Sequence, residues 1–276
     1  MTVTSVAMNL AGFAEQPGMP GNPYLIDADG HPYLPVGDGG VMLGVELGDS
    51  VFGFDAEHTS PAVSLVHPDQ PARHALTALA CLGNPVTVRG GDAAGAQGIV
   101  LGKTGEAGRV LAWFPADVRA TIAPGDPMAI RAHGQGAPAP TGLTLMNIDP
   151  AALSGLPVTL GDDAAEVRVR GQVGSALIGN GMGRPAHQWS LDVQVTAATA
   201  GPLGLTGLAL GDLLAVTDLD VRHNVGFRRG WTTVGVVVTT TSPRPGHGVS
   251  LMPILCGPAT QVTVAVDAAA HTGVRF

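Results

Sequence analysis

The sequence is short of cysteine, lysine, aromatic residues and long apolar runs, and each shortage excludes a class of protein. Cys81 and Cys256 are the only cysteines, which is too few for a disulfide framework and lacks the paired spacing of a zinc ribbon. The N-terminus has no basic segment followed by an apolar one. No window approaches the roughly 18 consecutive apolar residues of a membrane-spanning helix. We therefore expect a cytoplasmic protein with no membrane partner.

Charged residues are also scarce, at 13% of the chain, and the formal net charge is −8. Lys103 is the only lysine. Binding to phosphate backbones draws on clustered basic side chains, and the sequence has one basic group, formed by Arg222, Arg228 and Arg229. The composition therefore argues against a nucleic-acid partner.

Glycine and proline are abundant instead, with 40 and 22 residues, and 45% of the chain is hydrophobic. Because both residue types interrupt helices and shape turns, we expect a mainly β fold of small β-barrel units with a few short helices. The clearest helix is expected between Asp69 and Gly83, with Asp69 as N-cap and Pro71 in the first turn. Shorter helices are expected at 116–122 and 150–153.

Three segments share one local pattern, in which a Gly-Asp pair leads into a strand. They are residues 46–52, 123–130 and 208–216. Glycine accepts the positive φ of the turn, and the aspartate can bond backbone N–H groups that follow it. The pattern is common in small β-barrels and predicts architecture, with no bearing on chemistry.

Residues 86–103, followed by 109–114, resemble the KOW-type hairpin of SH3-like barrels, in which a glycine at the Gly98 position lets one strand bend over another. The loop has few basic residues, so the resemblance implies a barrel and no RNA-binding role.

Pro138 and Pro140 lie in the best linker candidate. We place a boundary near residue 145, between a β-rich domain of residues 1–145 and another of 146–276. Strands of the second are expected at 165–170, 188–196, 213–217, 232–239 and 260–266.

Charge is concentrated between residues 217 and 249, and this crowding predicts a site. Asp218 and Asp220 have strand spacing and should project from one face. Paired carboxylates bind divalent metals, or divide into an acid and a base when their environments differ. The alternative is a turn in which one aspartate caps backbone N–H groups and the other pairs with Arg222 or Arg228.

Arg228 and Arg229 are adjacent at the start of a buried strand, so one of them should face inward. An inward guanidinium needs an anionic partner. We assign both to the binding of an anionic substrate group, together with His223 and with Asn180 of the glycine-rich turn 179–184, whose N–H groups can face an anion. The alternative is an ion network with the nearby aspartates.

His247 lies in segment 243–248, where prolines and glycines fix an irregular backbone that can aim its side chain. Imidazole titrates near neutrality and serves as a general base, proton donor or metal ligand. The alternative is an exposed loop histidine. His58 is a further candidate ligand because Asp55 and Glu57 closely precede it, although no HxH, HExxH or CxxC spacing is present.

Several segments together resemble a family of uncharacterised bacterial and archaeal proteins, the domain of unknown function 4438. The matching segments span most of the chain and are residues 57–64, 81–84, 90–98, 146–148, 181–184, 218–230 and 246–248. The resemblance implies a shared β-rich fold and carries no mechanism. The family pattern tends to place a histidine directly after the second aspartate, where this chain has Val221, with His223 two positions later.

We therefore expect a small-molecule enzyme in which Asp218, Asp220, His247 and His58 converge on a cleft and hold a divalent metal such as zinc, manganese or iron. Asp220 or His247 is expected to act as base in hydrolysis or proton transfer on an anionic or carbonyl-containing substrate. The alternative is a non-catalytic binding or assembly protein. Because sheet edges and apolar faces need cover, we also expect a homo-oligomer.

Overall fold

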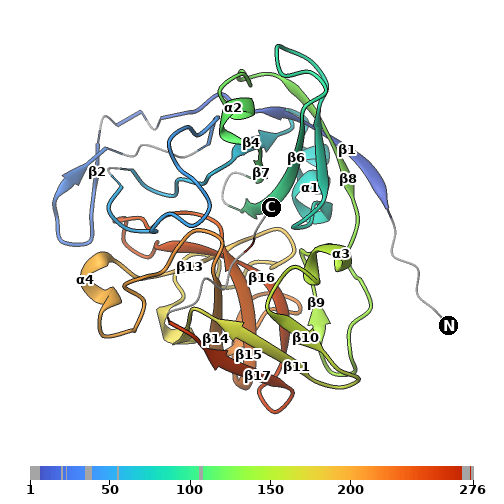
Figure 1. Ribbon diagram of the computed structural model, residues 1–276. Helices are drawn as coiled ribbons and strands as arrows, with labels where there is room; N and C mark the ends of the chain where they lie inside the picture. The colour runs from blue at the N-terminus through green and yellow to red at the C-terminus, as the bar shows by residue number, and fades with distance from the viewer. Residues whose placement is uncertain are drawn as a thin grey trace.

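The computed structural model describes residues 7–19, 21–22, 24–34, 39–54, 56–105, 108–268 and 274. It confirms the mainly β fold with a barrel and a few short helices (Figure 1). Six antiparallel strands close the barrel in the order β1, β4, β7, β6, β5 and β8. Their bounds are β1 Met8–Ala14, β4 Val63–Val66, β5 Pro85–Val88, β6 Gln97–Thr104, β7 Arg109–Trp113 and β8 Pro127–Ala132.

The helices form where local capping signals predict them. In α1 (Gln70–Leu79), the side chain of Asp69 accepts a hydrogen bond from the Ala72 N–H at 2.9 Å, and a proline lies in the first turn. The helix ends before Ala80, whose backbone is extended, and so does not reach Gly83. Two short helices lie in the predicted segments, α2 (Ala116–Arg119) and α3 (Pro150–Leu153), and α4 (Ala197–Ala200) was not predicted.

The three Gly-Asp turns share one geometry. Their glycines all have positive φ, between +91° and +93° for Gly48, Gly125 and Gly211. Each aspartate accepts a hydrogen bond from the N–H three residues before it, at 2.8, 2.8 and 3.0 Å for Asp49, Asp126 and Asp212. The prediction that these aspartates bond N–H groups following them is therefore wrong: the donor precedes each aspartate, because the chain folds back toward the residue that enters the turn.

Gly98 lies where β6 passes closest to the end of β7. A Cβ at this position would be 2.5 Å from both the Phe114 ring and the carbonyl oxygen of Trp113. Only glycine fits such an approach, as the predicted hairpin requires. The more specific comparison with SH3-like barrels stays a prediction.

The second half of the chain forms a larger sheet in the order β12, β14, β15, β16 and β13, with β9 also pairing with β16. Its strands are β9 Thr144–Leu145, β12 Gly171–Gly174, β13 Leu191–Val193, β14 Leu213–Asp220, β15 Gly226–Val237 and β16 Val249–Pro258. A smaller sheet contains β10 Val158–Leu160, β11 Ala165–Val169 and β17 Val262–Val266, and a 3₁₀ turn covers Ser175–Leu177. Strand β16 was not predicted, and it contains Pro253, Gly257 and Pro258, residue types that are uncommon inside strands. Pro253 lies where the pairing with β15 shifts register.

The barrel and the large sheet share a hydrophobic core. A Cβ on Gly102 of β6 would lie 2.6 Å from the Val238 side chain, which shows how closely the two layers pack. Figure 1 shows the barrel, in blue and green, above the yellow-to-red sheet. One buried cluster joins them and contains Leu101, Leu111, Leu213, Val238, Met252 and Ile254. This packing brings loops of the first half against the sheet of the second.

The chain between β1 and β4 contains a small hairpin of β2 (Leu25–Ile26) and β3 (Pro32–Tyr33). The hairpin stands away from the body of the molecule in Figure 1. Among the described residues, the helices are all too short or too polar to cross a bilayer.

Candidate metal centre

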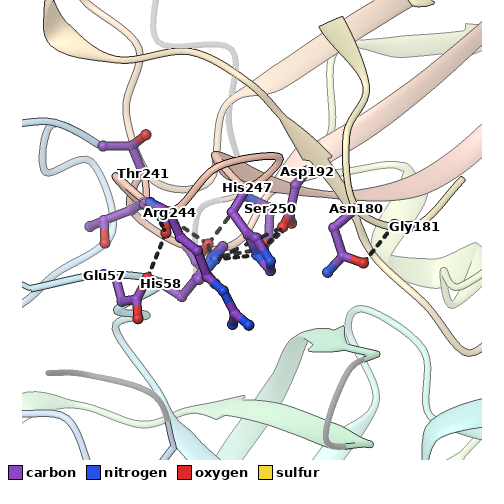
Figure 2. A network of polar contacts seen from close by, with 12 residues as sticks. Glu57, His58, Asn180, Gly181, Asp192, Thr241, Arg244, His247 and Ser250 are labelled. Carbon is purple, nitrogen blue, oxygen red and sulfur yellow. Dashed lines mark hydrogen bonds and ion pairs between the residues drawn. The ribbon is translucent and has the colours of Figure 1, made fainter. Parts of the chain in front are cut away.

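Two histidines and one aspartate meet where the first half of the chain contacts the large sheet (Figure 2). His58 lies in the segment between β3 and β4, Asp192 is the middle residue of β13, and His247 is in the loop that leads into β16. Their side chains are 17%, 4% and 11% exposed. The structure therefore brings together the two histidines that the sequence indicated, and it adds a carboxylate that the sequence did not.

The three facing atoms form a compact triangle. His58 Nε2 lies 3.3 Å from His247 Nδ1, His247 Nδ1 lies 3.0 Å from Asp192 Oδ2, and His58 Nε2 lies 3.9 Å from the same oxygen. The point in their plane that is equidistant from all three is about 2.0 Å from each, which matches zinc–nitrogen and zinc–oxygen bond lengths. The three atoms are therefore close enough together to share one metal ion.

Asp192 Oδ2 is a buried oxygen that lacks a hydrogen-bond partner within the described part of the chain. His247 Nδ1 lies 3.0 Å from this oxygen and forms an ion pair with it when the imidazole is protonated. Oδ1 of the same carboxylate is satisfied, since Ser250 Oγ donates to it at 3.0 Å. Buried polar atoms are nearly always paired. A cation at the centre of the triangle would give Asp192 Oδ2 a partner.

The surrounding hydroxyl groups orient His58. Its Nδ1 lies 3.4 Å from both Thr239 Oγ1 and Ser250 Oγ. A proton on Nδ1 can be donated to these oxygens, which leaves the lone pair of Nε2 facing the centre. Histidine ligands of metals are commonly fixed in this way. Ser250 is itself buried and donates to Asp192, so it is a poor candidate for a nucleophile.

The backbone around His58 is held in an unusual conformation. His58 has a φ of +50°, a strained value for a residue with a side chain. The preceding residue, Glu57, is buried and accepts hydrogen bonds at Oε2 from Ser242 Oγ at 2.5 Å and from the Tyr33 hydroxyl at 3.1 Å. Burial, together with the charge of Glu57, raises the pKa of Tyr33 to about 12, so this hydroxyl remains a donor. Glu57 thus joins the His58 segment to the His247 loop.

Glycines allow the His247 loop to approach the sheet. A Cβ on Gly248 would lie 1.9 Å from the carbonyl oxygen of Val193, and one on Gly179 would lie 2.0 Å from that of Gly246. The loop is further fixed by a hydrogen bond from the Asn180 N–H to Gly246 O at 2.8 Å. The predicted rigidity of segment 243–248 therefore comes mainly from its contact with residues 179–180 and 193.

A small pocket of about 40 Å³ opens beside the triangle. It is lined by the three candidate ligands and by polar side chains that include Glu57, Thr104, Arg109, Asn180, Ser190 and Arg244. Asn180 is the predicted substrate-binding residue that lies in this pocket. Arg109 also pairs with Glu15 at 2.5 Å, while Arg244 is exposed at the rim.

Asp218 and Asp220, expected beside His247, make their contacts in the β14–β15 hairpin and do not line this pocket. Asp220 pairs with Arg222 at 2.9 Å and with Arg228 at 3.0 Å. Burial alone would raise the pKa of Asp220, but the hydrogen bonds and charges of these arginines outweigh it and hold that pKa far below its usual range. Asp218, with a φ of +56°, accepts a hydrogen bond from the Gly230 N–H at 2.7 Å. These contacts are those of the ion network given as the alternative.

The other predicted residues of this hairpin face solvent. Arg228, Arg229 and His223 are exposed, so the expectation that one arginine faces inward is not met. The guanidinium groups of Arg222 and Arg228 instead stack on the Trp231 ring, 3.8 and 4.3 Å from its centroid. Asp55, considered with His58, lies outside the described residues.

Sequence reasoning missed Asp192 and Arg244. Asp192 is a single acid between Leu191 and Val193 in a strand that was predicted, and its neighbours are buried. An acidic residue flanked by core positions needs a partner, and that is the signal that could have identified it. Arg244 lies between two prolines in the segment already chosen for His247.

Comparisons with known proteins agree with the fold. Two family models match the chain, described as Domain of unknown function (DUF4438), N-terminal, over residues 24–154, and the C-terminal model of the same family over residues 155–273. A solved structure described as "Crystal structure of TM1086" is 29% identical, with 97% of this chain and 95% of that chain covered and a TM-score of 0.91. No curated protein matches the chain. The first matched region contains His58 and the second contains Asp192 and His247, so the candidate centre is built from residues of both regions.

Proposed function

The chain belongs to the DUF4438 family, and from that starting point we propose that it is a divalent-metal enzyme acting on a small carbonyl-containing or anionic substrate. The observation that carries the proposal is the His58–Asp192–His247 triangle, in which a buried carboxylate oxygen lacks a hydrogen-bond partner among the described residues. Two imidazoles and one carboxylate form a ligand set found in catalytic zinc sites and in non-haem iron sites. Zinc, manganese and iron are the candidate metals.

Three protein ligands leave metal positions open for water and substrate, and this distinguishes catalytic sites from closed structural ones. When bound, such a metal lowers the pKa of a water molecule and polarises a carbonyl oxygen. The protein supplies the remaining parts. Ser250 and Thr239 orient two of the ligands, and Glu57 holds the His58 segment to the His247 loop. Hydrolysis is the reaction class that this arrangement favours, with a metal-assisted proton transfer as the related possibility.

Metal analysis tests the proposal directly. The purified protein is stripped with a chelator, reloaded with zinc, manganese or iron(II), and assayed for bound metal. We expect about one ion per chain for at least one of the three metals. Only trace metal after reloading with each of them would contradict the proposal. Loaded and stripped protein are then compared on a panel of esters, lactones and amides, where turnover by the loaded form alone is the expected result.

A second candidate is assembly, which the β2–β3 hairpin favours. Tyr24, Ile26 and Leu34 are 53%, 49% and 58% exposed on this projecting element. Exposed apolar groups of this kind are typical of contact surfaces, so we propose a homo-oligomer in which the hairpin is covered. Light scattering on the wild type and on Ile26→Asp would test this, with a smaller particle expected for the variant.

The two free, buried cysteines are compatible with the proposed cytoplasmic location.

A further inference from the structure

We infer that the ligand of this centre carries a carboxylate group, which Arg244 and Asn180 hold while one of its oxygens takes an open position on the metal. This inference deepens the proposed function and depends on it.

The first support is charge. Among the described residues that line the pocket, Glu57 and Asp192 are acidic and Arg109 and Arg244 are basic. Arg109 is balanced by Glu15 at 2.5 Å. Arg244 keeps its charge whatever else it contacts, because a guanidinium does not lose its proton in proteins. A divalent ion in the triangle would place further positive charge beside the same pocket, so that an anion there would be attracted by both the ion and the guanidinium.

The second support is the orientation of the Asn180 amide. Its Oδ1 accepts a hydrogen bond from the Gly181 N–H at 3.0 Å, and this fixes which end of the amide is which. The Nδ2 group is therefore turned the other way, and Figure 2 shows it on the side that faces His247 and Asp192. An amide nitrogen does not ligate a metal, but it donates well to an anionic oxygen.

Arg244 supplies a second donor on the same pocket. Figure 2 shows its guanidinium group extending past His58 and His247 from the loop at the rim. The loop that carries Arg244 also carries His247, and the Arg244 carbonyl accepts a hydrogen bond from the His247 N–H at 3.0 Å. Arginine binds carboxylates through paired, charge-assisted hydrogen bonds. Anion binding and metal binding are therefore served by one short segment.

The third support is size. A cavity of about 40 Å³ has room for about three water molecules when compared with the space that one water needs. A carboxylate group, with one carbon and two oxygens, is of a similar size. The rest of the ligand must then extend through the pocket opening, past Arg244.

The experiment uses the cobalt(II)-loaded protein, because the visible absorption of cobalt changes when an anion binds to the metal. Acetate is the probe, acetamide is its uncharged match in shape, and inorganic phosphate is the competing anion. Dissociation constants are measured for the wild type, Arg244→Gln, Asn180→Ala and the control Arg228→Gln, which removes an exposed arginine outside this pocket. Each variant is first checked for an unchanged cobalt spectrum without acetate.

We expect Arg244→Gln to weaken acetate binding at least about tenfold, which corresponds to about 1.4 kcal/mol. Asn180→Ala should weaken it several-fold, Arg228→Gln should match the wild type, and acetamide should bind weakly to all four proteins. Equal acetate affinity in the wild type and Arg244→Gln would overturn the inference, as would tighter binding of phosphate than of acetate. Failure of the wild type to bind cobalt at all would instead contradict the proposed function.

Discussion

Replacing Asp192 with asparagine is the most direct test of the metal centre. The change keeps the shape of the side chain and an oxygen for Ser250, but it removes the anionic oxygen that lies 3.0 Å from His247 Nδ1 and 3.9 Å from His58 Nε2. Loss of an outer partner of a metal ligand already costs 10–100-fold in affinity. Loss of a ligand itself should cost at least about 100-fold, or about 2.7 kcal/mol.

This loss can be read as a change in melting temperature. Zinc at about 100 times its dissociation constant stabilises the folded wild type by about 2.7 kcal/mol. With an unfolding entropy of about 2.1 cal/mol/K per residue and 276 residues, the melting temperature should rise by about 5 °C. At the same zinc concentration, a 100-fold weaker site gives about 0.4 kcal/mol and a rise below about 1 °C. Scanning calorimetry with and without zinc resolves this difference, and metal analysis confirms it.

Asp220→Asn is the matched control, because it removes another partly buried carboxylate whose contacts lie in the β14–β15 hairpin. It should lower the melting temperature of the metal-free protein by breaking the pairs with Arg222 and Arg228, yet keep the full rise with zinc. If Asp192→Asn retained the rise, or if Asp220→Asn lost it, the assignment of Asp192 as a ligand would be wrong.

Two further changes probe the His247 loop and the buried Lys103. Gly248→Ala places a Cβ 1.9 Å from Val193 O, so it should displace the His247 loop and abolish metal binding. The control Gly174→Ala, with open space around its Cβ, should leave the amount of bound metal unchanged. Equal metal content in the two variants would contradict this prediction. Burial lowers the pKa of Lys103 from 10.5 to about 8. Since the unfolded chain keeps this proton up to higher pH, stability should rise between these values by up to about 3 kcal/mol. The free energy of unfolding in urea is measured at pH 7.5 and at pH 10 for the wild type and for Lys103→Met, and the variant should lack the increase between the two pH values. The same increase in both proteins would refute the prediction.

Local features of the fold could be predicted because short-range interactions determine them. The start of α1 depends on Asp69 and Pro71, and each Gly-Asp turn is closed by a bond within four residues. Strand β16 could not be predicted in the same way. Its Pro253 is tolerated because the pairing with β15 shifts register at that point, and this shift exists only in the assembled sheet.

The candidate site was predictable only in part. His247 was marked by the rigid loop that carries it, and His58 by the acids that precede it. The cluster at 218–229 attracted attention for the same reason, its density of charge, but there the acids and arginines are close enough to satisfy one another. A dense charge pattern in sequence therefore indicated an ion network, whereas Asp192, the proposed metal ligand, is an isolated charge in sequence.

The sequence by itself determined a β-rich chain with defined turns, one well-capped helix and two histidines suited to a site. Tertiary structure decided which carboxylate joins them and which arginine stands beside them. His58 and His247 are 189 residues apart in the chain, and Asp192 reaches them only because β13 pairs with β16 opposite Ser250. Residue preferences act over a few positions, while this meeting depends on strand pairing and on the packing of a barrel against a sheet.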